Sequence, residues 1–426
     1  MFLAAAVFGA AAVPAWLYLR QCGYTAASAD WHGHELLFGY VLAVVGGFLT
    51  GPVSRRAAVG LGVAWLVARV SALVEPFGTV HATATATFAV GLAGLSAPKL
   101  LRGPSQPRNR VLGLVVVAIL AMAVLTPFAQ AHRTRLLLVV IDLYAILITF
   151  MGGRLIAAAA AGAYYRSGRQ LDARVQPRLE ATVFMVLLLL AVSDLVRAPA
   201  LVTSAIAIVA AGLSLARWLR WRLWTCLGSW SLSALGAGYL WLAVGLGLRA
   251  LRQHPLWVLP TDALHGLTIG AIGALTLLVM GRTQAMTTGV RPERSHRLLL
   301  IAIFVNAATG LRLMAGLTRC LPRTYLLQAA VVAWSSACLV LVWFLLSLPE
   351  ASRGQKHNGD AGSHDGHGNL HARTHRVSFT HRHAPGASHE HAYTSRRQLP
   401  HRHLCGRRRS NNQRLRGDAG HTGCGQ

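Results

Sequence analysis

The sequence has 426 residues, of which 54% are hydrophobic and 13% are charged. So large a hydrophobic fraction over this length exceeds what one soluble core needs, so the composition excludes an ordinary soluble domain and predicts an all-α fold, a polytopic membrane helix bundle surrounded by the lipid bilayer. The net charge of +27 is first explained by anionic lipid beside the cytoplasmic face of a membrane. Nucleic acid is therefore not a predicted partner.

Apolar segments long enough to cross a bilayer, roughly 20 residues each, recur along the chain. We predict about twelve transmembrane helices: Phe2 to Leu19, Leu36 to Leu49, Ala57 to Val74, Val80 to Ala97, Val111 to Phe128, Leu136 to Leu155, Ala181 to Leu195, Ala198 to Leu215, Trp230 to Leu248, Leu264 to Met280, Leu298 to Leu317 and Leu326 to Leu348. The turn at 194–198 is short, so the seventh and eighth spans alternatively form one long kinked segment.

Basic residues favour every second loop between these spans. The loop after the second span carries Arg55 and Arg56, and the loop after the sixth carries Arg166 and Arg169, whereas the loop after the third span has no Lys or Arg. Because loops rich in Lys and Arg stay on the cytoplasmic side, both termini are predicted to be cytoplasmic.

The segment Trp31-His32-Gly33-His34-Glu35 places two imidazoles and a carboxylate at the outer mouth of the second span. Neutral imidazole is a common ligand of haem iron and copper and needs no charge to be buried. Residues two apart on a helix point about 200° apart, so His32 and His34 face one metal only if His32 sits on extended backbone. Alternatively they serve different centres, or Glu35 hydrogen-bonds a neighbouring imidazole. A pair of interfacial histidines beside Trp31 is the competing interpretation.

The tenth span enters from the same face as the second, at His265. Thr268, Ile272 and Thr276 follow His265 in steps of three and four residues, which gives one polar stripe along the helix. Simple helix packing explains the threonines and the neighbouring glycines. His265 itself needs a polar partner when it is buried, and a metal is one such partner.

The remaining polar residues of the spans are weaker signals. Arg154 and Arg282 close the sixth and tenth spans on the cytoplasmic side, while His81, His132 and His254 lie in outer loops or at span ends. Asp194 stands three residues before Arg197, a spacing that favours a helical ion pair. Asp142 lies inside the sixth span, and Arg69 and Arg312 have no evident partner in the sequence.

Several motifs of the chain resemble the NnrS family of membrane proteins. They are Trp31-His32-Gly33-His34-Glu35 with Phe38-Gly39, then Gly152-Gly153-Arg154, Gly238-Tyr239-Leu240-Trp241, and Leu264-His265-Gly266 continuing to Gly273 with Thr276 and Arg282. The resemblance runs in order from near residue 1 to about residue 350. It implies a twelve-span, haem- and copper-containing protein of the bacterial inner membrane, linked to the nitric oxide response and to protection against nitrosative stress.

The chain also departs from the family pattern. After Arg282 the family usually continues with Gly-His-Thr-Gly, where this chain has Met286-Thr287-Thr288-Gly289, and a histidine that commonly precedes the Gly-Tyr-Leu-Trp element is replaced near Gly236. Fewer potential ligands therefore remain, and an altered or lost metal site stays open as an alternative.

The segment 351–426 differs from the membrane domain 1–350. It holds twelve of the nineteen histidines and thirteen Lys and Arg against four acidic residues. Such a composition cannot bury a core, so we expect a disordered, His- and Arg-rich cytoplasmic tail that could gather copper, nickel or zinc. A reading-frame error that replaced the true carboxy terminus would produce the same composition.

Together these features predict a haem- and copper-associated inner-membrane protein of nitric oxide stress defence. His34 and His265 are the expected axial or copper ligands, followed by His32, with Glu35 as a further ligand or orienting one of the imidazoles. Arg154 and Arg282 are expected to hold lipid headgroups or haem propionates. Redox or nitrosyl chemistry is compatible with such a centre, so enzymatic activity stays open. The alternative is a transporter or channel for a metal ion or small solute.

Overall fold

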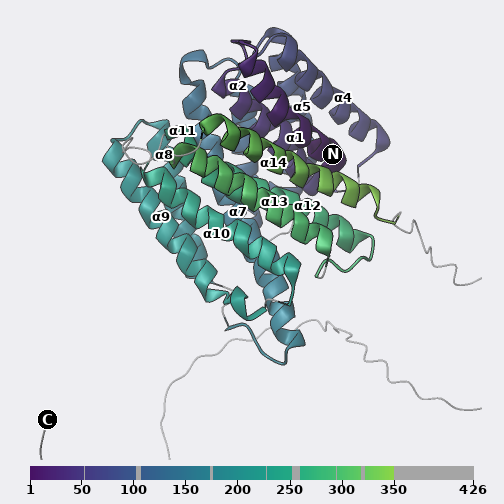
Figure 1. Ribbon diagram of the computed structural model, residues 1–426, viewed down its shortest axis with the longest axis vertical. Coiled ribbons are helices and arrows are strands. Elements are labelled where there is room, and N and C mark those ends of the chain that lie inside the picture. The colour runs from purple at the N-terminus through teal and green to yellow at the C-terminus, as the bar shows by residue number, and fades with distance from the viewer. Residues whose placement is uncertain are drawn as a thin grey trace, which may run out of the picture. The chain divides into compact units, whose positions relative to one another are not determined.

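The computed structural model describes residues 1–51, 53–101, 107–172, 176–226, 228–251, 260–293, 295–317 and 322–349, all within a compact unit that spans Met1–Lys356. This described part is built from helices and contains no strand. In Figure 1 the colour runs along the chain, from purple at α1 through teal to green at α14. Their bounds are α1 Phe2–Gln21, α2 Ala29–His34, η1 Glu35–Val41, α3 Leu42–Leu49, α4 Arg55–Val74, α5 Thr79–Leu101, α6 Pro107–Leu125, η2 Gln130–His132, α7 Arg133–Arg166, α8 Pro177–Leu195, α9 Ala200–Arg220, η4 Leu223–Cys226, α10 Trp230–Leu251, α11 Pro260–Ala263, η5 Gly266–Gly273, α12 Ala274–Thr287, α13 His296–Leu317 and α14 Arg323–Leu346.

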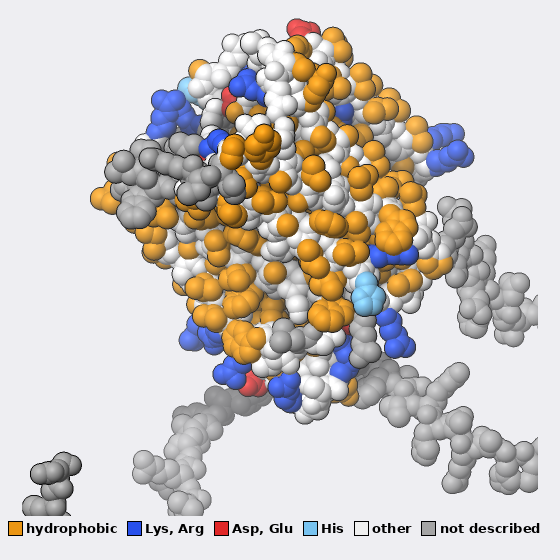
Figure 2. All heavy atoms as spheres, in the orientation of Figure 1, with side chains coloured by type: hydrophobic (Ala, Val, Ile, Leu, Met, Phe, Trp, Pro, Cys, Tyr) orange, Lys and Arg blue, Asp and Glu red, His pale blue; other side chains and the backbone are white. Residues whose placement is uncertain are grey.

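Ten helical segments in the described residues are long and apolar enough to cross a membrane. This confirms an all-helical, multi-pass fold. Each of the twelve spans predicted from the sequence corresponds to a helix or a run of helices, but α6 and α8 are not among the ten, so the count of twelve remains a prediction. Figure 2 shows hydrophobic side chains over the middle of the visible face, with most Lys and Arg toward two ends. This is the surface pattern of a protein that lies in lipid.

The turn between α8 and α9 resolves the alternative of one kinked helix. Helix α8 ends at Leu195 and α9 begins at Ala200. Between them Arg197 has a φ of 57°, in the left-handed region that ends helices. The seventh and eighth predicted spans are therefore separate helices.

Two spans are interrupted by π-helical segments, and both lie inside the bundle. The segment η1 joins α2 to α3, and η5 joins α11 to α12. In the spans 29–49 and 261–287, 67% of the hydrophobic window is buried, against 28% for α4. The Tyr40 hydroxyl lies 3.0 Å from the Thr276 hydroxyl, and the Tyr144 hydroxyl of α7 donates to the Leu37 carbonyl at 2.8 Å. The two interrupted spans and α7 thus form the centre of the bundle.

Charged side chains inside the bundle are paired with one another. Arg249 of α10 bonds both Asp142 of α7 and Asp194 of α8, so the partner of Asp194 is not the predicted Arg197. In the same way Arg217 of α9 contacts Glu180 of α8 at 2.7 Å. A buried charge without its partner is costly. A shift of one helix that separated such a pair would therefore be unfavourable, so these pairs hold neighbouring helices in register.

Candidate metal centre

The two histidines of the second span contact different neighbours. The Ser28 hydroxyl caps α2 by accepting from the Trp31 backbone N–H at 3.1 Å. His32 stacks on Trp16 of α1 with ring centroids 4.2 Å apart, whereas His34 is fully buried. The two imidazoles therefore lie in different environments, as expected for residues two apart on a helix.

The buried environment of His34 is a cluster of four ionisable side chains, which we call the Glu35 cluster: His34, Glu35, Arg69 and His81. All four are buried. One Glu35 carboxylate oxygen lies 3.1 Å from His34 Nδ1 and 3.3 Å from His81 Nε2, and the other accepts from the Arg69 guanidinium at 2.6 Å. Three spans contribute to the cluster, since His34 and Glu35 come from the second span, Arg69 from α4 and His81 from α5.

The hydrogen bonds fix which nitrogen of each ring carries its proton. The Phe77 backbone N–H donates to His81 Nδ1 at 2.9 Å, so the proton of neutral His81 sits on Nε2, facing Glu35. A carboxylate only accepts, so His34 donates through Nδ1 and keeps a lone pair on Nε2. That Nε2 is buried and has no hydrogen-bond partner in the described residues.

Phe77 is part of the frame that holds these rings. Its φ of 64° is unusual for a bulky residue. Its ring lies edge-on to His34 at 5.3 Å, and the Arg133 guanidinium carbon stands 3.5 Å from its centroid. A backbone conformation of this kind costs of the order of 1–3 kcal/mol and occurs often at functional sites.

The donor set of the Glu35 cluster fits a metal ion. Donor atoms of His34, Glu35 and His81 all lie within 4.8 Å of one another. The nitrogen of this set that offers a lone pair is His34 Nε2, because His34 Nδ1 and His81 Nε2 face the Glu35 carboxylate at 3.1 and 3.3 Å. An imidazole held by a carboxylate through its other nitrogen is also the usual arrangement behind a metal.

The structure places His265 in a second region, with His32 rather than with His34. His265 Nδ1 donates to the Thr261 carbonyl at 2.7 Å, which leaves its Nε2 as the lone-pair nitrogen. His32 and Arg312 lie within electrostatic range of His265. The buried carboxylate of Asp262 holds Arg312 at 2.6 Å, so this guanidinium has the partner that the sequence did not reveal.

Arg154 and Arg282 lie far along their helices from the histidines. Arg282 follows His265 by 17 residues, which corresponds to roughly 25 Å at 1.5 Å per residue. It donates to the Ser231 hydroxyl at 2.6 Å, and the Arg154 guanidinium lies over the Phe150 ring at 4.8 Å. Neither contact brings a guanidinium to the histidine end of the bundle, and contacts of either residue with lipid or haem stay predictions.

The sequence does not predict two members of the Glu35 cluster, Arg69 and His81, as site residues. In the sequence His81 is a histidine at a span end, and Arg69 is a cation without an evident partner. Arginine is rare inside a membrane and requires a carboxylate nearby. This rule predicts a partner for Arg69, and Glu35 is an acidic residue at the matching depth. His254 lies outside the described residues.

The comparison with protein families agrees with these motifs. Residues 1–348 match the model of the NnrS family, described as NnrS protein. No curated protein matches the chain. The matched region contains every described helix, including both π-helical segments and the Glu35 cluster. The chain therefore belongs to the NnrS family.

Proposed function

We propose that this protein binds copper and haem within the membrane and acts in the nitric oxide response, protecting metabolism against nitrosative stress. Family membership supports the physiological role. The observation that carries the metal assignment is the buried Nε2 of His34, unpaired within the described residues, beside His81 and Glu35. Copper and haem iron would supply redox chemistry and bind small ligands.

Copper fits the Glu35 cluster by donor type and by charge. Imidazole nitrogens suit copper. The Arg69 guanidinium already balances the Glu35 carboxylate, so the incoming ion meets neutral imidazole and no further negative charge. Since excess charge is costly in a buried site, monovalent copper is favoured over a divalent ion. His34 would bind it through Nε2, with Glu35 as the acceptor that orients His34. His81 would join it as a second ligand only after passing its Nε2 proton to Glu35.

Haem is assigned to the second region, at His265 and His32. Both rings are half-buried, and His265 Nδ1 is already engaged by the Thr261 carbonyl. A proximal histidine of haem proteins commonly has its other nitrogen held in this way. Arg312 and Arg323 share the single carboxylate of Asp262, which leaves one positive charge for propionate groups.

The setting of this function is the inner membrane of a bacterium, with twelve spans and both termini in the cytoplasm. The ten apolar helices support a multi-pass protein. The alternation of basic loops in the sequence supports the orientation. The histidine regions would then lie toward the outer face. The tail 351–426, which lies outside the described residues, would be a separate cytoplasmic segment.

The experiment that tests this function combines spectroscopy with a growth assay. Protein from haem-replete cells is purified in detergent, and its absorption spectrum, iron and copper contents are measured for wild type, His34→Ala and His265→Ala. We expect loss of the haem Soret band in His265→Ala and loss of copper in His34→Ala. A strain that lacks the protein should grow more slowly under nitric oxide, and only the wild-type gene should restore growth fully.

The transport alternative makes the opposite prediction for the purified protein. A colourless, metal-free wild type from haem-replete cells would contradict the cofactor assignment. In that case the Glu35 cluster and the π-helical segments would be expected to line a pathway for a solute or an ion.

A further inference from the structure

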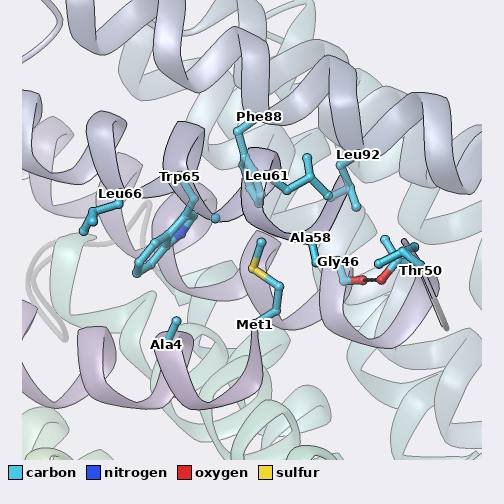
Figure 3. A pocket seen from close by; sticks show the side chains of 12 residues that line it. Met1, Ala4, Gly46, Thr50, Ala58, Leu61, Trp65, Leu66, Phe88 and Leu92 are labelled. Atoms are coloured by element: carbon cyan, nitrogen blue, oxygen red, sulfur yellow. Dashed lines mark hydrogen bonds between the residues drawn. The ribbon is translucent and has the colours of Figure 1, made fainter. Parts of the chain in front are cut away.

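A cavity of ≈ 390 Å³ lies between α1, α3, α4 and α5, and two of these helices, α4 and α5, also carry Arg69 and His81 of the Glu35 cluster. Its volume is in the range of roughly 300–1,000 Å³ that ligand pockets have. Figure 3 shows Met1, Leu61 and Phe88 around a common space, with Trp65 and Leu66 at one end and Thr50 at the other. The walls are mainly apolar.

The cavity opens to the outside of the bundle. Two lining residues of α4, Ala58 and Leu66, are exposed, and Gly62 between them is half-buried. A side chain built on Gly62 would meet no atom within 4 Å, so the helix leaves free space there. An elongated molecule can therefore enter from the lipid side.

Two basic residues stand at the Thr50 end. Lys99 follows the lining residue Leu92 by seven positions on α5, so both share one face of the helix, and its ammonium donates to the Thr50 carbonyl at 2.8 Å. An ammonium has three N–H donors, which leaves two for a ligand. Arg55, exposed at the start of α4, precedes Ala58 by three positions and lies on the lining face of that helix.

The opposite end of the cavity leads toward the Glu35 cluster without exposing it. Trp65 closes this end, and its indole N–H donates to the Gly39 carbonyl at 2.8 Å. Arg69 follows one turn beyond Trp65 on α4, and its guanidinium is already paired with Glu35. The free positive charge of the cavity is therefore at the Thr50 end, not at the Trp65 end.

We propose that this cavity binds one anionic phospholipid, with an acyl chain inside and the phosphate between Arg55 and Lys99. The Thr50 end of the cavity lies on the side that the charge pattern predicts to be cytoplasmic, where anionic headgroups attract basic residues. Haem also combines an apolar body with acidic groups, but the lining contains no histidine. An acyl chain needs no such ligand.

Native mass spectrometry of the full-length protein tests the site directly. The protein is exchanged into detergent that contains phosphatidylglycerol or phosphatidylcholine. The fraction of protein that retains one bound lipid molecule is then measured. We expect wild type to retain phosphatidylglycerol at least tenfold more than phosphatidylcholine. Arg55→Gln with Lys99→Gln should remove this preference. Arg220→Gln with Arg291→Gln makes the same change in net charge at exposed positions that do not line the cavity, and should keep it.

A pair of glycine variants tests the interior of the cavity. Gly62→Leu would fill the space and abolish lipid retention. Gly60→Leu lies two residues away on the same helix, also meets no atom within 4 Å, and does not line the cavity, so retention should be unchanged. Equal retention of both lipids by wild type, or retention of phosphatidylglycerol by Gly62→Leu, would overturn the proposal. Haem lost from Gly62→Leu but not from Gly60→Leu would assign the cavity to haem instead.

Discussion

Arg69 compensates the buried charge of Glu35. Among the described residues it supplies the only full positive charge in contact with the Glu35 carboxylate when both histidines are neutral. Removing one partner of a buried ion pair costs about 3–5 kcal/mol, since the other charge stays buried and uncompensated. Arg69→Met should therefore lower the thermal unfolding midpoint of the detergent-purified protein strongly.

The double variant Arg69→Met with Glu35→Gln is the matched control for this effect. It leaves no unpaired charge, so it should recover much of the lost stability. Equal midpoints for the single and the double variant would contradict the compensating role of Arg69.

Sequence reasoning found half of this cluster. His34 and Glu35 stand together in one motif, so their chemistry is visible in the sequence. Arg69 and His81 reach Glu35 from α4 and α5, and contacts between helices are set by packing that no local pattern records. The same reason makes Asp194 pair with Arg249 across helices and not with Arg197 nearby.

At the scale of elements, the π-helical segment η5 depends on close approach to α10. A Cβ on Gly245 would stand 2.6 Å from the Leu267 backbone nitrogen, and backbone cannot move aside as a flexible side chain can. Gly245→Ala should destabilise the protein by about 1–3 kcal/mol through overpacking and displace the segment that follows His265. Thermal unfolding and the haem spectrum measure the two effects.

Gly247→Ala is the control on the same helix, because its Cβ would meet no atom within 4 Å. It should leave both the midpoint and the spectrum unchanged. If both alanine variants behaved alike, the approach of α10 to η5 would not matter.

The two π-helical segments should differ in their effect on the two histidine regions. A π-helical turn contains an extra residue relative to an α-helix, so deleting Leu36 would turn α2 by about 100° relative to α3. Since α2 carries both His32 and His34, we expect that deletion to remove copper and haem. Deletion of Ile269 in η5 should remove haem and spare copper. Iron and copper are measured in both purified proteins, and loss of copper from the Ile269 deletion would contradict this expectation.

The sequence located both of these spans but not their π-helical geometry. Hydrophobic length predicts that residues cross a bilayer, whereas a π-helical turn is fixed by the contacts of one short segment. Glycines at positions 39 and 270 permit such contacts, since a Cβ there would stand 2.6 Å from Arg69 and 2.7 Å from Trp241. Without the neighbouring helices these glycines look like ordinary packing residues.

At the scale of the whole molecule, the twelve-span topology makes a labelling prediction. Cys22 is exposed after α1, in a loop predicted to face outward. Gly168→Cys would place a thiol after α7, in a loop predicted to be cytoplasmic. In a background without other cysteines, a membrane-impermeant maleimide should label Cys22 in intact spheroplasts, and Gly168→Cys only after lysis. Labelling of both in intact spheroplasts would contradict the topology.

The fold class and the approximate span boundaries were predictable because lipid imposes length and apolarity on every span. Helices α6 and α8 are not among the ten apolar helices. Arg178, Glu180 and Asp194 lie in α8, and the two acids bond arginines of α9 and α10. Such pairing is a property of the assembled bundle.

The most direct test of the central claim is the copper content of the purified protein truncated after residue 350, which removes the His-rich tail as a source of metal. We predict copper in wild type and its loss in both His34→Gln and His81→Gln, while His132→Gln, an exposed histidine, keeps it. Copper that persists in His34→Gln and His81→Gln would contradict a metal centre at the Glu35 cluster.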